Sequence, residues 1–264
     1  MNQQEKEKFI ESNLISLDKL CELHKKVNKL DVSLSNLLPV AIVENNTFFI
    51  FDLDSCGKRY ELKLEHYSTM PIPKRVLAAF PLEFYDMKPC AVVSQDSFET
   101  LEGYIFIFHE FVHCFQWNNC ENEIREQLKI SKKVKEESNF MWELNYPFPY
   151  KDETFIEETL KLEVYLSIND YSNVIGYYKN MKKYLNEIDY EYMIWQQWKE
   201  GFARYIENEI RGVFSISIKK SSMKSFNRES FYIIGSEYIW LLLKNNTNLK
   251  CDLKKLFILM SNVD

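Results

Sequence analysis

The chain has 264 residues, of which 46% are hydrophobic and 27% are charged, a balance typical of folded proteins and not of disordered ones. Acidic and basic residues are interleaved along the chain and leave a formal net charge of −6. The basic stripe of a nucleic-acid-binding protein is therefore missing, and we expect no nucleic-acid partner. The lysine pairs Lys132–Lys133 and Lys219–Lys220 stand among acids and serines, so we expect both pairs to be solvated.

Three features bear on where the protein works. The first residues are polar, and no apolar segment of a signal peptide follows them. No apolar run approaches the roughly 20 residues that a membrane-spanning helix needs. The six cysteines form no CxxC pair, which is typical of reduced thiols in a cytosolic chain of this length. We therefore expect a cytoplasmic protein without membrane contact, and the sequence leaves its oligomeric state open.

The first third of the chain changes from a helical to a β-rich pattern. Residues 4–30 carry apolar side chains at helical intervals, which predicts an amphipathic helix. Short β-rich runs follow, with turn residues such as Asn45 and Asn46 between them, and they predict a small antiparallel sheet. Four prolines between residues 71 and 89 predict an irregular connection. The predicted strands are residues 40–43, 47–53, 59–64 and 91–94.

The rest of the chain has a helical pattern. A helix capped by Asp96 or Ser97 is predicted to run to about Trp117. These elements predict an α+β fold, in which a small antiparallel sheet lobe, residues 1–94, precedes a larger helical lobe, residues 95–264. We expect the two lobes to form one structural unit with a cleft. The further predicted helices are residues 120–138, 153–169, 171–185, 188–213, 228–244 and 252–261.

Two of the four histidines occur in the sequence HEFVH, which runs from His109 to His113. On a helix, side chains four residues apart lie about 6 Å apart on one face, so two imidazoles can bind one zinc ion. Glu110 lies beside them, where it can take a proton from a water on the metal without being a ligand. The alternative is a core helix that carries two histidines by chance, but burying these polar groups without a partner is costly.

A zinc site of this kind needs a third protein ligand. No histidine follows His113, so a carboxylate on another helix is the remaining common choice. Glu200, in the segment EGFARY, fits this choice because the small residues Gly201 and Ala203 let its helix pack closely against the metal helix. Other helical acids, which spacing alone does not exclude, are Glu157, Glu158 and Glu163.

HEFVH followed by EGFARY resembles the gluzincins, zinc peptidases with two histidines on one helix and a glutamate on the next. The resemblance covers three short segments, residues 104–117, 198–208 and 231–243. It implies a zincin-like fold with Glu110 as the general base. In aminopeptidase-type gluzincins a tyrosine stabilises the oxyanion, and the resemblance implies that role for Tyr232 in the segment FYIIG. The implied zinc ligands are His109, His113 and Glu200.

The chain departs from that family at several points. Glu200 follows His113 by 87 residues, a long gap that implies inserted helices. Lys199 stands where the family has an asparagine, and Ile234 replaces the lysine of its Y-x-K-G segment. The G-x-M-E-N segment, which holds a substrate's free amino group in those aminopeptidases, is absent. Aminopeptidase specificity is therefore not implied.

Together these patterns predict a zinc metallopeptidase that acts on a peptide or protein substrate. The strand at residues 91–94, just before the metal helix, is expected to be an edge strand that can pair with an extended peptide. Glu207 is a candidate acceptor for the second N–H of a ligand histidine, although a surface ion pair between Arg204 and Glu207 is the favoured alternative. Two other functions stay open: a zinc amidohydrolase acting on a small amide, and a non-catalytic helical interaction protein with a structural or vestigial metal site.

Overall fold

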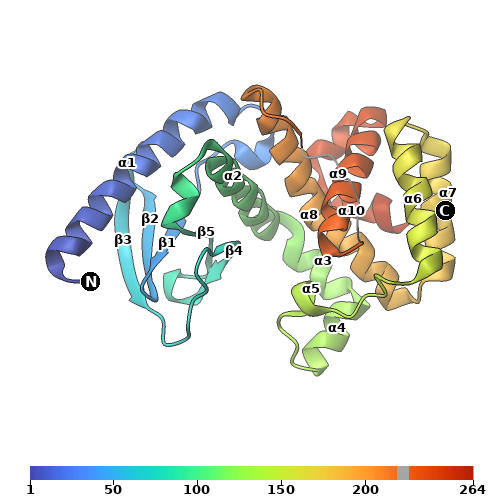
Figure 1. Ribbon diagram of the computed structural model, residues 1–264, viewed down its shortest axis with the longest axis horizontal. Helices are drawn as coiled ribbons and strands as arrows, with labels where there is room; N and C mark the ends of the chain where they lie inside the picture. Colours follow the sequence, from blue (N-terminus) through green and yellow to red (C-terminus); the bar gives the residue numbers. More distant parts are fainter. Residues whose placement is uncertain (219–225, 264) are drawn as a thin grey trace. The chain divides into compact units, whose positions relative to one another are not determined.

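The computed structural model describes residues 1–218 and 226–263 (Figure 1), so the predicted solvation of Lys219–Lys220 lies outside the described residues. The fold is α+β, as predicted, with a five-stranded sheet in the N-terminal part and a larger helical region after it. The chain divides into two compact units, Met1–Asn119 with Ile206–Ser217, and Cys120–Tyr205 with Ile218–Asp264. The predicted boundary after residue 94 lies inside the first unit, and the predicted division into lobes stays a prediction.

The sheet of the first unit has the strand order β3-β2-β1-β5-β4. Strands β1 and β2 form a hairpin whose two turn residues, Asn45 and Asn46, have φ angles of 49° and 59°. Positive φ at both central positions matches the right-handed twist of a hairpin, and asparagine tolerates it. The strands are Val40–Glu44 (β1), Thr47–Leu53 (β2), Tyr60–Tyr67 (β3), Leu77–Leu82 (β4) and Lys88–Ser94 (β5).

The prediction of a purely antiparallel sheet is wrong, because β1 and β5 pair in parallel, with Val40 opposite Ala91. The prediction of an edge strand at residues 91–94 is also wrong, since β5 lies between β1 and β4. Its residues 90–93 are all buried, as expected of a strand with neighbours on both sides and a covered sheet. The two edge strands are β3 and β4.

Strand β4 lies where an irregular connection was predicted. It pairs antiparallel with β5, and Pro81 stands opposite Pro89. Proline removes a backbone donor, so within a sheet it is confined mainly to edge strands and strand ends. The prolines therefore mark an edge strand here and not the absence of a strand. The 3₁₀-helix Glu83–Tyr85 and a turn at Asp86 and Met87 connect β4 to β5.

Both faces of the sheet are buried. One face carries an apolar cluster that includes Ala41, Ile50 and Val92, and half-buried residues of the connection around β4 cover it. On the other face, Phe49 packs against Phe9 of helix α1 (Gln3–Val27), with their ring centroids 4.8 Å apart. The helix predicted over residues 4–30 is thus present and ends three residues earlier.

The helix that carries HEFVH is α2, Leu101–Gln116, which packs on β4 and β5. It begins later than predicted, because residues Gln95–Phe98 form a 3₁₀-helix and Thr100 is the N-cap. Gly103 allows this entry: a Cβ atom there would lie 1.9 Å from the carbonyl oxygen of Ser97. After Gln116 the chain makes a π-helical turn, Trp117–Glu121.

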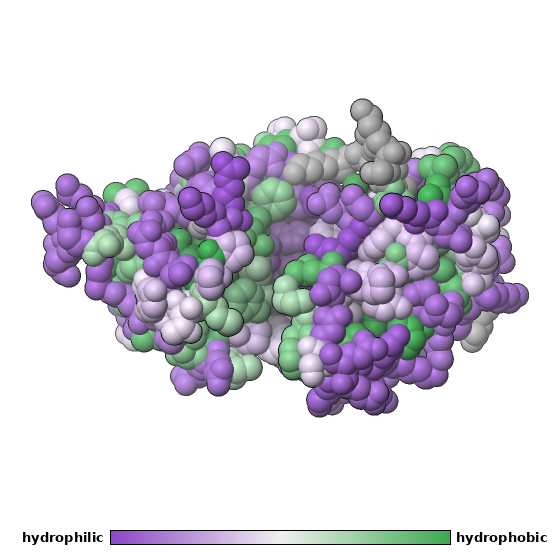
Figure 2. Space-filling model, turned by 60° about the horizontal axis from the view of Figure 1, so that its bottom comes forward, coloured by the Kyte–Doolittle hydropathy of each residue, from purple (hydrophilic) through white to green (hydrophobic). Residues whose placement is uncertain are grey.

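The second unit is built mainly from helices, and the predicted helices recur with small shifts at their ends. The long predicted helix at residues 120–138 is instead divided into shorter ones. No helix within residues 1–218 and 226–263 is both long and apolar enough to cross a membrane. The surface view in Figure 2 shows hydrophilic and hydrophobic residues intermixed. The helices are α3 (Asn122–Gln127), α4 (Lys129–Glu136), α5 (Trp142–Asn145), α6 (Glu153–Ser167), α7 (Tyr171–Tyr184), α8 (Glu187–Val213), α9 (Arg228–Asn245) and α10 (Leu253–Ser261), with a 3₁₀-helix at Thr247–Cys251.

Candidate metal centre

Helix α2 buries the polar residues of the HEFVH motif. His109, Glu110 and His113 are only 5%, 6% and 7% exposed, and the apolar residues around them are buried as well. The two imidazole rings lie on one face of the helix, with centroids 4.8 Å apart. The i, i+4 spacing therefore brings the histidines together as predicted.

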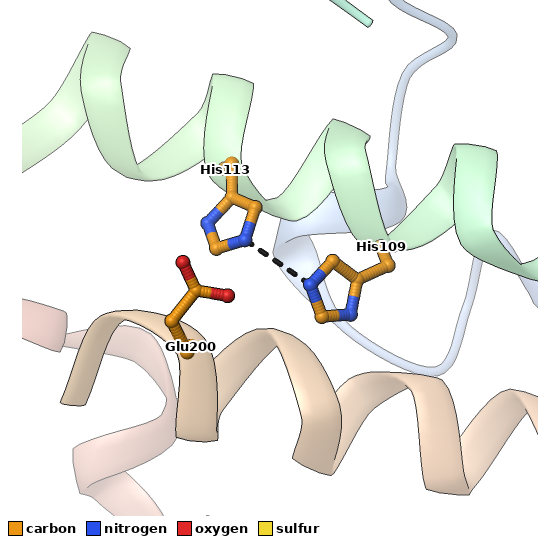
Figure 3. Close-up of side chains that lie close together, drawn as sticks. All are labelled: His109, His113 and Glu200. Atoms are coloured by element: carbon orange, nitrogen blue, oxygen red, sulfur yellow. Dashed lines mark hydrogen bonds between the residues drawn. The ribbon is translucent and has the colours of Figure 1, made fainter. Parts of the chain in front are cut away.

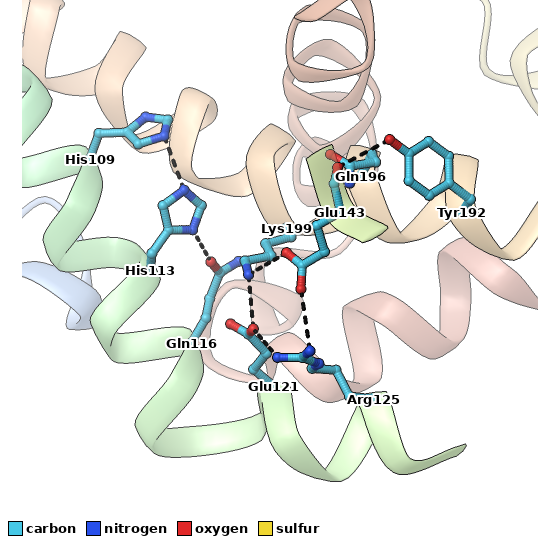
Figure 4. Close-up of polar contacts among 9 residues, drawn as sticks. All are labelled: His109, His113, Gln116, Glu121, Arg125, Glu143, Tyr192, Gln196 and Lys199. Carbon is cyan, nitrogen blue, oxygen red and sulfur yellow. Dashed lines mark hydrogen bonds and ion pairs between the residues drawn. The ribbon is translucent and has the colours of Figure 1, made fainter. Parts of the chain in front are cut away.

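Each histidine uses its Nδ1 atom for a contact inside the protein. His113 Nδ1 lies 2.8 Å from Gln116 Oε1 (Figure 4), and His109 Nδ1 lies 3.2 Å from Glu207 Oε2. Gln116 Oε1 can accept a hydrogen bond from His113 Nδ1, whereas Glu207 places a carboxylate beside His109 Nδ1 without a hydrogen bond; in neutral rings both contacts favour the tautomer protonated at Nδ1. In that tautomer the ring lone pair lies on Nε2.

The two Nε2 atoms face each other at 3.1 Å (Figure 3). Two acceptors at this distance repel each other unless a proton or a metal cation lies between them. Tetrahedral zinc with Zn–N bonds of about 2.0–2.1 Å requires its two nitrogen ligands to be about 3.3 Å apart. The distance between the two Nε2 atoms is therefore compatible with two ligands of one tetrahedral metal ion.

Glu200 on α8 completes a group of three candidate ligands. One ligand atom each from His109, His113 and Glu200 lies within 4.8 Å of the others (Figure 3). Glu200 also stands seven residues before Glu207 on the same helix, so both side chains leave α8 on the same side. Within the described part of the chain, this is the group of histidine, cysteine or acidic side chains that can hold a metal ion.

Glu207 is fully buried, so the prediction that it lies at the surface is wrong, and the predicted contact with a histidine of the motif is present. Arg211, one turn later and 1% exposed, donates from Nε to Glu207 Oε1 at 3.0 Å. Its NH1 atom donates to Glu102 Oε1 at 2.9 Å. A chain of charged groups thus holds the carboxylate beside the Nδ1 atom of His109.

Gly201 has a different role from the one predicted. A Cβ atom on Gly201 would lie 2.7 Å from the backbone of Gly235 on α9, and one on Gly235 would lie 2.3 Å from the carbonyl oxygen of Gln197. Gly201 therefore allows α8 to cross α9 closely. The prediction that it lets α8 pack against the metal helix is wrong.

The two predicted catalytic residues lie on α2 and α9. Glu110 is buried next to His109 in the sequence and is not among the three candidate ligands. Tyr232 is half-buried on α9, and the guanidinium of Arg228 lies 5.2 Å from the centroid of its ring. Their catalytic roles stay predictions.

Sequence reasoning missed a cluster of charges beside Glu200. Lys199 contacts Glu121 at the end of the π turn and Glu143 on α5, and Arg125 lies near both acids (Figure 4). The pKa of Glu143 is lowered: burial raises it, but the positive charges of Lys199 and Arg125 outweigh burial and the repulsion from Glu200. The departure from the family's asparagine at Lys199 was the sequence signal for this cluster.

Comparison of the chain with known proteins found no match. No family model, no curated protein and no solved structure matches the chain. The gluzincin resemblance therefore rests on the short segments around HEFVH, EGFARY and FYIIG alone, and the chemistry of the centre is inferred from its own residues.

Proposed function

We propose that the protein is a zinc-dependent hydrolase of the peptidase type, with His109, His113 and Glu200 as the zinc ligands. One observation carries the proposal: ligand atoms of His109, His113 and Glu200 lie within 4.8 Å of one another, with the two Nε2 atoms 3.1 Å apart. Three protein ligands also leave one position open, which is typical of catalytic zinc and not of structural zinc.

The ligand set favours zinc over the hard cations. Calcium and magnesium prefer oxygen ligands, whereas two imidazoles and one carboxylate are a common catalytic set for zinc. The non-catalytic interaction protein that the sequence left open would need a fourth protein ligand to close the site. Within the described residues the group contains three.

Zinc at this site would supply Lewis acidity, which polarises a carbonyl and acidifies a water molecule. Glu110 would take the proton from the attacking water and pass it to the leaving amine. Tyr232 would donate its hydroxyl proton to the developing oxyanion.

A peptide substrate is favoured by the free edge of the sheet. Strand β4 is an edge strand, its residues are exposed or half-buried apart from Leu82, and helix α2 packs on it. An extended peptide can add to such an edge by main-chain hydrogen bonds. A sheet edge next to the helix that bears the histidines is the zincin-like arrangement proposed for this fold. A small amide substrate would bind at the same zinc centre without pairing with the edge strand β4.

The function is tested by measuring zinc content and hydrolysis together. The purified protein should contain one zinc per chain and cleave members of a peptide library. The Glu110→Gln variant should keep its zinc, since Glu110 is not a ligand, and lose at least about a hundredfold in rate, the range for removal of a general base. Glu157→Gln, a change of an exposed acid on α6, is the matched control and should behave as wild type.

Two results would contradict the proposal. The first is a wild-type protein that takes up no stoichiometric zinc even when zinc is supplied. The second is a Glu110→Gln variant that loses its zinc, because the roles of Glu110 and Glu200 would then be wrongly assigned.

A further inference from the structure

Lys199 immediately precedes Glu200 on α8, and its ammonium group is largely withdrawn from water. The side chain is 14% exposed. Its Nζ atom lies 2.9 Å from Glu121 Oε1 and 2.7 Å from Glu143 Oε2 (Figure 4). The proposed zinc chemistry assigns no task to this lysine, and a surface lysine would not need one buried and one half-buried acid as partners.

The charges in this cluster balance each other. Glu121 is 2% exposed and Glu143 is 20% exposed. Arg125 lies 3.7 Å from a carboxylate oxygen of each acid. Two acids and two bases thus share one small volume, and removal of one partner from such a cluster leaves an uncompensated charge at a high cost.

The cluster fixes one face of α8. The main-chain oxygen of Glu143 accepts a hydrogen bond from Tyr192 at 3.1 Å and one from Gln196 at 2.9 Å. With Lys199 these donors stand at positions i, i+4 and i+7, which is one face of a helix over two turns. The short helix α5 is therefore held along α8 up to the turn that carries Glu200.

The π turn is the third segment of the cluster. Glu121 is its last residue, and Lys199 bonds to that side chain. A π turn interrupts the regular α-helical register, and such interruptions are frequent at functional sites. Lys199 thus ties the turn of α8 next to Glu200 to two segments that are far away in the sequence.

From these contacts we propose that Lys199 is a positioning residue for the metal centre. Through Glu121 and Glu143 it holds the turn of α8 that bears Glu200 in its metal-binding conformation before a metal binds. Zinc binding then does not have to order that turn. Because the conformational entropy of ordering is not lost on binding, the affinity for zinc is higher. The inference rests on the proposed function, since it concerns the same ligand.

The test is the zinc affinity of the full chain, measured by competition with a chromophoric chelator. Lys199→Met should weaken zinc binding by about 10–100-fold, the range for residues that support metal ligands. Lys199→Arg keeps a positive charge between the two acids and should restore most of the affinity. Lys129→Met is the matched control, because Lys129 pairs with Glu187 at the surface of the same unit, and it should bind zinc as wild type does.

A second variant covers the case in which Lys199→Met fails to fold. Glu143→Gln keeps the side-chain shape and leaves Lys199 paired with Glu121, so it should fold and weaken zinc binding in the same direction by a smaller factor. The absorption of bound Co²⁺ gives an independent signature, because a displaced carboxylate ligand changes the intensity and position of the visible bands. A merely structural role would leave that spectrum unchanged.

The outcomes separate this inference from the proposed function. Wild type that binds zinc, together with Lys199→Met and Glu143→Gln variants of unchanged affinity and unchanged Co²⁺ spectrum, would overturn the role of Lys199 alone, even if both variants melt at lower temperature. Wild type that binds no zinc would overturn the proposed function and this inference with it.

Discussion

At the scale of single residues, the metal centre depends on which ring nitrogen each histidine turns toward the other. Gln116 can accept from His113 Nδ1, and the carboxylate of Glu207 lies beside His109 Nδ1, so each ring turns its Nε2 atom toward the other. Loss of one acceptor would free its ring to rotate or to change tautomer. The acceptors should therefore control zinc affinity without being ligands themselves.

The Glu207→Gln variant tests this dependence. The amide keeps the size of the side chain but removes the negative charge that lies beside His109 Nδ1, so zinc affinity should fall by about 10-fold or more. Glu209→Gln, an exposed position two residues away on α8, is the control and should leave the affinity unchanged. Chelator competition measures both variants. Equal affinities for the two would show that Glu207 does not orient His109.

Only some of these side-chain contacts could be predicted from the sequence. The HEFVH spacing is local, so it predicted the histidine pair directly, and Glu207 was recognisable two helical turns after Glu200. The role of Glu102 could not be recognised in the sequence. Its contact with Arg211 joins residues more than a hundred positions apart and leaves no local pattern. Nothing in the spacing of charges around Lys199 indicated that Glu121 and Glu143 would be its partners.

At the scale of elements, the close crossing of α8 and α9 determines where the ligand helix can lie. Gly201 and Gly235 meet backbone to backbone at this crossing. The contact begins one residue after Glu200, so any widening of the crossing moves the turn that bears the candidate ligand. Side chains larger than hydrogen at either position have no space.

Gly201→Ala should therefore destabilise the protein, although alanine is a better helix former than glycine. The added methyl group would lie 2.7 Å from the backbone of Gly235, and overpacking of this kind costs about 1–3 kcal/mol. Gly212→Ala on the same helix meets no atom within 4 Å and should be neutral or stabilising by up to about 1 kcal/mol. Urea unfolding of the two variants measures the difference; equal midpoints would contradict the tight crossing.

Helices were easier to predict than strands for a physical reason. The apolar periodicity of residues 153–169 and 188–213 is contained in each segment, and α6 and α8 occupy nearly those ranges. Strand β4 depends on pairing with β5, and Pro81 concealed it because edge strands tolerate proline. The parallel pairing of β1 with β5 joins residues about fifty positions apart. Neither segment alone contains a pattern that predicts this pairing.

At the scale of the whole molecule, the proposed function joins residues that are far apart in the chain. The histidines come from one helix, and Glu200 follows 87 residues after His113. The sequence prediction of Glu200 depended on the gluzincin resemblance and not on the spacing, which equally allowed Glu157, Glu158 and Glu163. The three candidate ligand atoms lie within 4.8 Å of one another, which favours Glu200 over those acids.

The most direct test of the central claim is a crystal structure of the zinc-loaded protein with anomalous data collected at the zinc edge. We expect one anomalous peak about 2.0–2.2 Å from His109 Nε2, His113 Nε2 and one oxygen of Glu200. A zinc ion bound to other residues would contradict the claim. So would a Glu200 carboxylate more than about 4 Å from the metal, twice the expected Zn–O distance of about 2 Å.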